Sequence, residues 1–157
     1  LKLFAYRFEG YWKDVGTIQS YWDANMDLLN EDISNSRLQF SLNDKDWRIY
    51  SNEWNTPPQY VNDTAIVKDA LINAGSWICG TVEKTIVFEN VEVEQGCIIY
   101  QSILHPGVKV GRDTVLERVI VMENTEIPEG VRIRIKEDEE PLVIDQASLK
   151  NMLFEKV

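Results

Sequence analysis

The sequence predicts a mainly β protein whose second half winds into a parallel β-helix, a solenoid of stacked coils. Three observations support this prediction. Three similar blocks, residues 85–93, 102–110 and 119–127, each begin 17 residues after the last. Within each period, aliphatic residues are separated by steps of six, six and five residues. Gly, Asn and Asp also return at fixed positions of the period. Self-similarity at a fixed period indicates stacked repeats.

The step of about six residues defines the kind of repeat. An α-helix would place apolar residues three and four apart, and an ordinary strand would alternate every second residue. Steps of six fit neither, but they fit a three-sided coil in which each side points one aliphatic side chain inward. Ordinary antiparallel hairpins would not keep the same steps through three blocks. We expect roughly four coils over residues 61–135, with an inner column of Val87, Val93, Ile99, Leu104, Val110, Leu116, Val121, Ile127 and Ile133.

The turn residues mark two corners of the coil. Gly, Asn and Asp tolerate the positive φ that tight corners often demand. One position of the period holds a Gly or Asn in each coil, provided that two residues are missing from the first coil. A second position holds a Gly or Asp. The first register is Gly75, Asn90, Gly107 and Asn124, and the second is Gly96, Asp113 and Gly130.

The first 35 residues predict a strand, a loop and a helix that precede the solenoid. Residues 3–8 alternate in part and indicate a strand, and residues 10–17 form a glycine-containing loop. Thr17 is a good helix N-cap. Apolar residues at helical spacing then predict an amphipathic helix from Ile18 to about residue 31. Those apolar residues are Ile18, Trp22, Met26 and Leu29.

Two further segments flank the solenoid. Residues 36–60 predict a linker that contains a short strand at 47–50 and the rigid pair Pro57-Pro58, which leads the chain into the first coil. Residues 136–157 predict a tail: a solvated acidic run at 137–140, a strand at 141–144, and a helix at 146–155 capped by Asp145. One face of that helix, with Leu149, Met152 and Leu153, is expected to be buried.

Composition excludes several classes of function. The 157 residues carry a net charge of −10, which argues against nucleic-acid binding because phosphate neutralisation needs clustered Lys and Arg. No apolar run is long enough to predict a membrane span, and no signal peptide is visible. Cys79 and Cys97 fall in different registers, so we expect free thiols in a reducing cytoplasm and no zinc cluster.

One motif carries a specific resemblance. Residues 10–17 are Gly-Tyr-Trp-Lys-Asp-Val-Gly-Thr, followed by a helix, a strand, a Pro-Pro pair and hexapeptide repeats. This order resembles the ADP-glucose pyrophosphorylase (glucose-1-phosphate adenylyltransferase) family of bacterial glycogen biosynthesis from about residue 6 to residue 135. The resemblance implies a left-handed coil, which the spacing alone does not define, and it implies that this chain, starting at Leu1, is a C-terminal fragment.

The resemblance also implies a reaction and two site residues. Family members join glucose 1-phosphate to ATP and release pyrophosphate, with Mg²⁺ bridging phosphate oxygens. By the family's pattern, Asp14 is a metal ligand and Trp12 lies at the sugar-phosphate pocket. The remaining catalytic groups are not in this sequence, so we expect the fragment itself to be inactive. An intact motif favours the catalytic type of subunit over a non-catalytic companion.

A regulatory role for the solenoid is implied in the same way. In the family it serves subunit contact in homo- or hetero-tetramers, and small phosphorylated effectors bind near the junction between domains. Arginines that enterobacterial relatives use for effector phosphate correspond here to Glu123 and Gln146, so a fructose-bisphosphate response is in doubt. Arg112 and Arg118 lie nearby and are either effector contacts or solvated side chains.

Two rival interpretations remain at this stage. A hexapeptide acyltransferase would use a His as general base, and the single His is His105. That interpretation gives the loop at 10–17 no role. A purely structural scaffold would associate through the open end of its solenoid.

Overall fold

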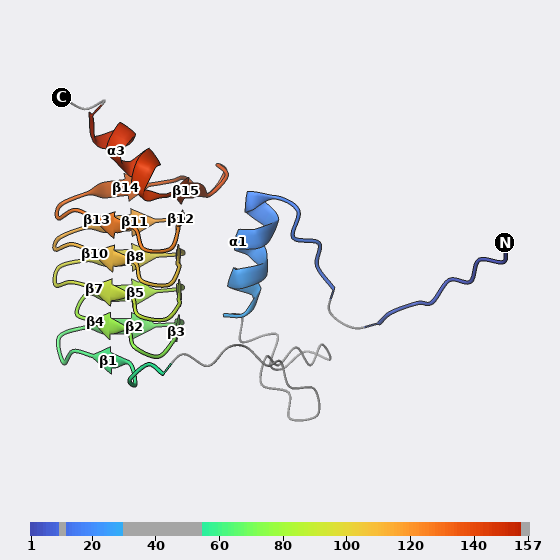
Figure 1. The fold of residues 1–157 in the computed structure, drawn as a ribbon, viewed down its shortest axis with the longest axis horizontal. Coiled ribbons are helices and arrows are strands. Elements are labelled where there is room, and N and C mark those ends of the chain that lie inside the picture. Colours follow the sequence, from blue (N-terminus) through green and yellow to red (C-terminus); the bar gives the residue numbers. More distant parts are fainter. Residues whose placement is uncertain (10–11, 30–54, 155–157) are drawn as a thin grey trace.

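The computed structural model describes residues 1–9, 12–29 and 55–154, and its main body is a triangular β-solenoid (Figure 1). Three parallel five-stranded sheets form its sides. Sheet A consists of β1 (Tyr60–Val61), β4 (Trp77–Ile78), β7 (Glu92–Val93), β10 (Lys109–Val110) and β13 (Glu126–Ile127). Sheet B consists of β2 (Ile66–Lys68), β5 (Thr81–Glu83), β8 (Ile98–Tyr100), β11 (Val115–Glu117) and β14 (Arg132–Arg134). Sheet C consists of β3 (Leu71–Ile72), β6 (Ile86–Val87), β9 (Ile103–Leu104), β12 (Val119–Val121) and β15 (Leu142–Ile144).

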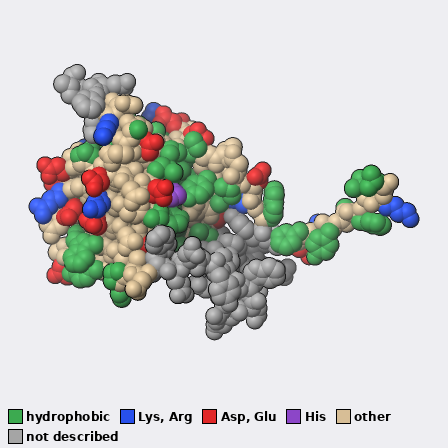
Figure 2. Space-filling model, in the orientation of Figure 1, with side chains coloured by type: hydrophobic (Ala, Val, Ile, Leu, Met, Phe, Trp, Pro, Cys, Tyr) green, Lys and Arg blue, Asp and Glu red, His purple; other side chains and the backbone are tan. Residues whose placement is uncertain are grey.

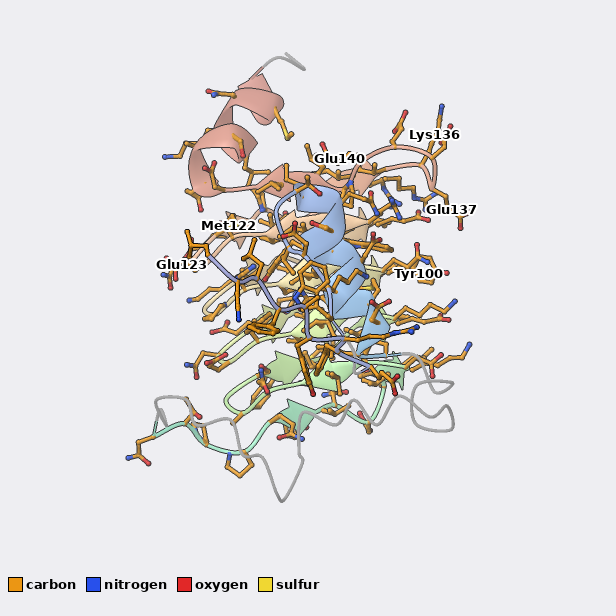
Figure 3. The ribbon with its side chains drawn as sticks, turned by 90° about the vertical axis from the view of Figure 1, so that its right-hand side faces the viewer. Tyr100, Met122, Glu123, Lys136, Glu137 and Glu140 are labelled. Atoms are coloured by element: carbon orange, nitrogen blue, oxygen red, sulfur yellow. The ribbon has the colours of Figure 1, made fainter. Side chains whose placement is uncertain are left out.

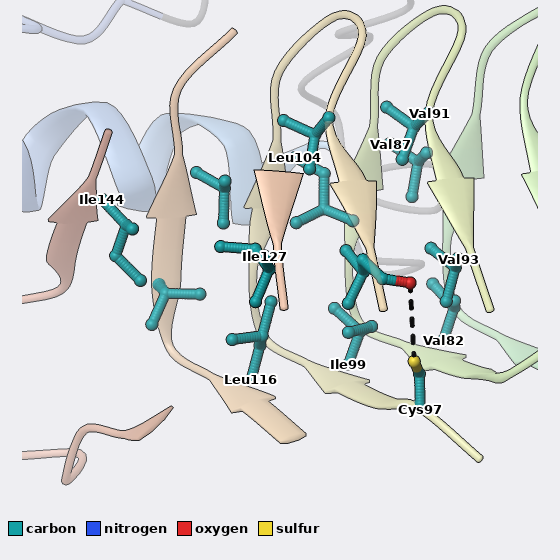
Figure 4. Packing of buried hydrophobic residues seen from close by; sticks show 14 of the residues in the cluster. Val82, Val87, Val91, Val93, Cys97, Ile99, Leu104, Leu116, Ile127 and Ile144 are labelled. Atoms are coloured by element: carbon teal, nitrogen blue, oxygen red, sulfur yellow. Dashed lines mark hydrogen bonds between the residues drawn. The ribbon is translucent and has the colours of Figure 1, made fainter. Parts of the chain in front are cut away.

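The inner aliphatic column is confirmed. Eight of the nine predicted side chains are buried in one core cluster, and Ile133 is partly buried and packs against it. Figure 4 shows part of this cluster, including Val87, Ile99 and Leu116. The pairing register explains the column, because Val110 lies beside Val93 and Ile127 in neighbouring coils. Each coil thus stacks its aliphatic side chains on those of the coil below and pairs its backbone with both neighbours.

The two predicted corners of the coil are confirmed. The structure also has a third corner with left-handed residues, which was not predicted. The Gly, Asn and Asp residues of both predicted registers have positive φ. The corner between sheets B and C also has a left-handed residue in each of four coils, but these have little in common chemically: Asp69, Lys84, Gln101 and Arg118. Lys, Gln and Arg are not turn-forming types, so composition gave no signal there.

The two missing residues lie at the corner between β4 and β5, which is in the second coil and not in the first as expected. Neighbouring coils place four residues between these sides, as at residues 94–97, but only Cys79 and Gly80 connect β4 to β5. Gly80 permits this short corner because a Cβ there would lie 2.8 Å from the carbonyl oxygen of Cys97 and 2.9 Å from its Cβ. Cys79 and Cys97 are free thiols.

The last coil extends past the expected end at residue 135. A loop at 135–141 replaces the corner of one or two residues found in earlier coils, and β15 then pairs in parallel with β12. Helix α3 (Gln146–Phe154) follows and closes this end of the solenoid (Figure 1). Asp145 accepts a hydrogen bond from the Ser148 N–H at 2.7 Å as its N-cap, and Leu149 packs in the solenoid core at 1% exposure.

The N-terminal expectation was correct for the helix and wrong for the strand. Helix α1 (Ile18–Asp27) forms, ending four residues earlier than expected. Residues 1–9 form no strand, and Leu3 and Phe4 are 95% and 90% exposed. A strand needs a hydrogen-bonding neighbour, and no strand of the described residues pairs with this segment.

Other expectations fall partly outside the described residues. The strand at 47–50 and most of the linker lie outside them. Pro57 does lead into the first coil, and its carbonyl accepts a hydrogen bond from the Gly75 N–H at 2.6 Å. The left-handed winding stays a prediction. Within the described ranges, no helix is both long and apolar enough to cross a membrane.

Candidate functional site at the junction of α1 and the solenoid

The outer face of sheet C is apolar, unlike an ordinary solvated strand face. Strand residues alternate between the two faces of a sheet, so the neighbours of the inner Val87, Leu104 and Val121 point outward. Two outward columns result, and a sheet covered on both faces needs this continuous apolar pattern. One column is Ile86, Ile103, Ile120 and Val143, and the other is Phe88, His105 and Met122.

Helix α1 covers this face, descending from the last coils toward the earlier ones (Figures 1 and 3). Trp22 is 8% exposed and packs with Ile86, Ile103 and Ile120 in a second core cluster. Its indole N–H donates to the carbonyl of Gln101 at 2.9 Å, which satisfies its polar group. The helix is therefore attached to the solenoid by both apolar packing and a directed hydrogen bond.

The loop before α1 is bound to the helix itself. Thr17 and Ser20 form a capping box, in which the Thr17 hydroxyl accepts from the Ser20 N–H at 3.1 Å and Ser20 Oγ accepts from the Thr17 N–H at 2.9 Å. Lys13 Nζ lies 2.5 Å from Asp27 Oδ2, so the loop is also tied to the last residue of α1. Loop and helix thus form one unit.

The two residues expected to contact substrate and metal lie on this loop. Trp12 is 76% exposed, and Asp14 is exposed. Residues 10 and 11 of the motif lie outside the described residues. The described part of the chain contains no group of three or more His, Cys, Asp or Glu side chains that could hold a metal ion. Asp14 suits a Mg²⁺ ligand by its hard oxygen, but an octahedral ion needs more ligands than these residues supply.

A cavity of about 400 Å³ lies between the loop and sheet C. Its helix side is formed by residues 15–18 and Tyr21, and its sheet side by His105, Ile120, Met122 and Val143. Hydrophobic side chains surround the single histidine here, and acidic side chains lie beside it (Figure 2). The cavity is mostly apolar, with the Tyr21–His105 pair as its main polar group.

His105 is held within the chain. Its ring stacks on Phe88 with centroids 5.1 Å apart and planes at 3°, and its Nε2 lies 3.1 Å from the Tyr21 hydroxyl. Burial lowers its pKa from the ordinary value, and the charge of nearby Glu123 acts in the opposite direction. The outward position in the stack of Phe88 and Met122 was expected. A ring between two aromatics is poorly placed to be a base for a substrate from another subunit.

The two arginines lie at different corners of the fourth coil. Arg112 is at the corner between sheets A and B, where its side chain is 65% exposed and lies 3.7 Å from Glu94. Arg118 is at the corner between sheets B and C and is only 7% exposed. Its guanidinium lies 4.3 Å from the centre of the Trp22 ring and donates to Gln19 and to the carbonyl of Glu139.

Positions 123 and 146 behave differently from each other. Glu123 is exposed and follows Met122 in the chain. In Figure 3 these two residues lie on one side of α1, and Tyr100 lies on the other side. Gln146 Oε1 accepts a hydrogen bond from the Glu126 N–H at 2.9 Å and so ties α3 to the solenoid. Sequence reasoning missed Tyr21 and the contacts of Arg118, although Tyr21 stands beside the predicted helix residue Trp22.

Comparisons define the class of protein. The sequence model of the family described as GlmU-like, C-terminal hexapeptide matches residues 57–146, and that of the nucleotidyl transferase family matches residues 2–31. The chain therefore belongs to the GlmU-like C-terminal hexapeptide family.

Curated relatives with one shared name indicate a narrower group within this class. Proteins named glucose-1-phosphate adenylyltransferase from Bacillus thuringiensis (strain Al Hakam), Bacillus anthracis and Bacillus mycoides (strain KBAB4) are each 46% identical over 143 residues. The match covers 91% of this chain and 37% of each relative, so the chain spans little more than a third of their length. The resemblance stated from the sequence is confirmed.

Proposed function

We propose that this chain is the C-terminal part of a glucose-1-phosphate adenylyltransferase, which converts ATP and glucose 1-phosphate to ADP-glucose and pyrophosphate for glycogen synthesis. The observation that carries the proposal is the joining of two matches in one chain. A nucleotidyl transferase match at 2–31 is followed by a hexapeptide match at 57–146, and the same chain is 46% identical to proteins named glucose-1-phosphate adenylyltransferase.

The chemistry requires positioning more than covalent catalysis. A phosphate oxygen of glucose 1-phosphate attacks the α-phosphate of ATP, and pyrophosphate leaves. A divalent cation, for which we propose Mg²⁺, would neutralise the phosphate oxygens when bound. We assign Asp14 as one of its ligands and Trp12 as a contact of the sugar phosphate. Both side chains are exposed on a loop that α1 holds in place, which leaves them accessible to groups from the rest of the enzyme.

The solenoid would be the regulatory and assembly part of the enzyme. We propose that it takes part in a homo- or hetero-tetramer and responds to a small phosphorylated effector. Arg112 is an accessible candidate for an effector phosphate, since its only described ion pair is the 3.7 Å contact with Glu94. Arg118 would have to give up its bonds to Gln19 and Glu139 to serve the same purpose. Two free thiols are consistent with a cytoplasmic enzyme.

An assay of the full-length protein tests the proposal. The purified enzyme should form ADP-glucose and pyrophosphate from ATP and glucose 1-phosphate in the presence of Mg²⁺. The present chain alone should form none, because the rest of the nucleotidyl transferase domain is needed. A full-length protein that forms no ADP-glucose but binds acetyl-CoA would favour the acyltransferase interpretation. One that forms no nucleotide sugar and binds no phosphate would favour the scaffold.

A further inference from the structure

Arg118 is a charged side chain in a buried position, and such positions are costly unless the charge is compensated. It is 7% exposed and has a φ of 58°, in the left-handed region. No salt bridge to a carboxylate within 4 Å involves it in the described ranges. Its compensation comes from directed contacts with neutral groups instead.

Those contacts join three separate parts of the chain. Nε donates to the Glu139 carbonyl at 3.1 Å, in the loop of the last coil. A terminal nitrogen donates to Gln19 Oε1 at 3.0 Å, in the first turn of α1. The guanidinium carbon lies 4.3 Å from the centre of the Trp22 ring, on the next turn of α1. A planar guanidinium can make all three contacts at once, whereas a Lys ammonium cannot reproduce this fork over a ring.

The first turn of α1 leads directly to the loop that carries Asp14. Gln19 lies two residues after the cap Thr17 and five after Asp14. The capping box and the Lys13–Asp27 pair hold that loop to the helix. Any shift of the first turn of α1 on sheet C therefore moves the loop with it.

We propose that Arg118 is a positioning residue: it fixes the first turn of α1 on the solenoid, and so sets where Trp12 and Asp14 meet substrate. The inference rests on the proposed adenylyltransferase function. It links the loop at 135–141 to the catalytic side of the molecule through a single side chain. This role differs from effector binding, because the guanidinium already contacts groups of the same chain and is not free to bind a phosphate.

The test is a kinetic comparison of Arg118→Met with Arg132→Met in the full-length enzyme. Met keeps the apolar stem in both variants and removes the guanidinium. Arg132 is the matched control, since it is an exposed arginine of the last coil, in β14 of sheet B. Each protein is assayed well below its Tm for kcat, for KM toward glucose 1-phosphate, and for the Mg²⁺ concentration that gives half-maximal rate.

We expect kcat/KM for glucose 1-phosphate to fall by about 10- to 100-fold in Arg118→Met, because a misplacement of about 1 Å has effects of this size. The half-saturating Mg²⁺ concentration should rise as well. Arg132→Met should keep the wild-type values. A lower Tm with unchanged kinetic constants in Arg118→Met would overturn the proposal and leave a structural role only. Loss of effector response alone would overturn it too.

A second variant covers the case in which Arg118→Met does not fold. Gln19→Ala removes the acceptor on α1 and keeps a good helix former. It should change KM and the Mg²⁺ requirement in the same direction by a smaller factor, and unchanged constants would count against the proposal. If the wild-type full-length protein forms no ADP-glucose, the proposed function fails instead. The two failures are therefore distinguishable.

Discussion

The ring of His105 lies parallel to that of Phe88 in the coil below, while Tyr21 of α1 approaches its Nε2 at 3.1 Å. This arrangement places the only histidine of the chain at the contact between α1 and the solenoid. Since burial lowers its pKa from 6.5, the folded protein resists protonation of this ring. The groups facing it that can alter its charge balance are Tyr21 and Glu123.

This geometry predicts a stability that depends on pH near neutrality. Well above pH 6.5 the ring is neutral in both folded and unfolded states, so its stabilising contribution is complete. As the pH falls below this value, the unfolded chain takes up a proton first, and stability is lost until the pH passes the lowered pKa. Thermal melts of the chain between pH 5 and 8 should show Tm falling on the acid side.

His105→Phe is the matched variant for this prediction. Phe preserves stacking on Phe88 and does not titrate, so the loss of Tm between pH 5 and 6.5 should be reduced. Asp145 does not interfere, because hydrogen bonds from Ser148 lower its pKa below 3.8 and its contribution is lost only in more acidic solution. An unchanged pH dependence in His105→Phe would mean that other groups cause it.

Two neighbouring isoleucines lie on opposite faces of sheet B, so their replacement by Ala should lower the free energy of unfolding by very different amounts. Ile99 points into the core with 0% exposure, whereas Ile98 is 47% exposed on the outer face. Ile99→Ala should lower the free energy of unfolding by about 2–5 kcal/mol, because a cavity remains in a packed core. Ile98→Ala should cost about 1 kcal/mol or less. Urea unfolding of the two variants measures the difference, and equal losses would contradict the assigned register.

The short corner at Gly80 predicts a specific packing cost. An added Cβ would lie 2.8 Å from the Cys97 carbonyl oxygen and 3.0 Å from that of Glu94, and backbone atoms cannot rotate away. Gly80→Ala should therefore destabilise by about 1–3 kcal/mol through overpacking. Urea unfolding measures the loss.

Gly130 is the control because its φ is +73° and an added Cβ would meet nothing within 4 Å. Gly130→Ala isolates the conformational cost of a left-handed residue, about 1–2 kcal/mol. Gly80→Ala should also separate the first two coils from the third and speed hydrogen exchange of the Thr81 N–H, which donates to Cys97. Gly130→Ala should leave that exchange unchanged, and the reverse pattern would show that the corner was misassigned.

Sequence periodicity predicted the parts of this fold that repeat. The inner column was predictable because the same position of three successive coils holds an aliphatic residue, namely Val93, Val110 and Ile127. The corner that contains Lys84 and Gln101 was not, since a single left-handed residue can be of a type without turn preference. The long loop in the last coil also hid the pairing of β15, because it breaks the 17-residue spacing.

The candidate site was predictable only where a local motif marked it. Thr17 as a cap and Asp14 as a candidate ligand follow from residues close together in sequence. The contact between Arg118 and Gln19 joins positions 99 residues apart, so no spacing rule could indicate it. Such contacts depend on how α1 settles on sheet C, which only the packed structure defines.

Asp14 provides the most direct test of the proposed chemistry. In the full-length enzyme, Asp14→Asn removes a negative charge while keeping the size of the side chain, and a weakened metal ligand should lower turnover by about 100-fold or more. The fold should not change, because Asp14 is exposed on its loop. ADP-glucose formation measured over a range of Mg²⁺ concentrations should show partial recovery at high Mg²⁺ if the defect lies in metal binding. Asp69→Asn, at an exposed corner of the first coil, is the control and should retain wild-type turnover. Near-normal activity in Asp14→Asn would exclude this carboxylate from the site, even if the wild-type enzyme makes ADP-glucose.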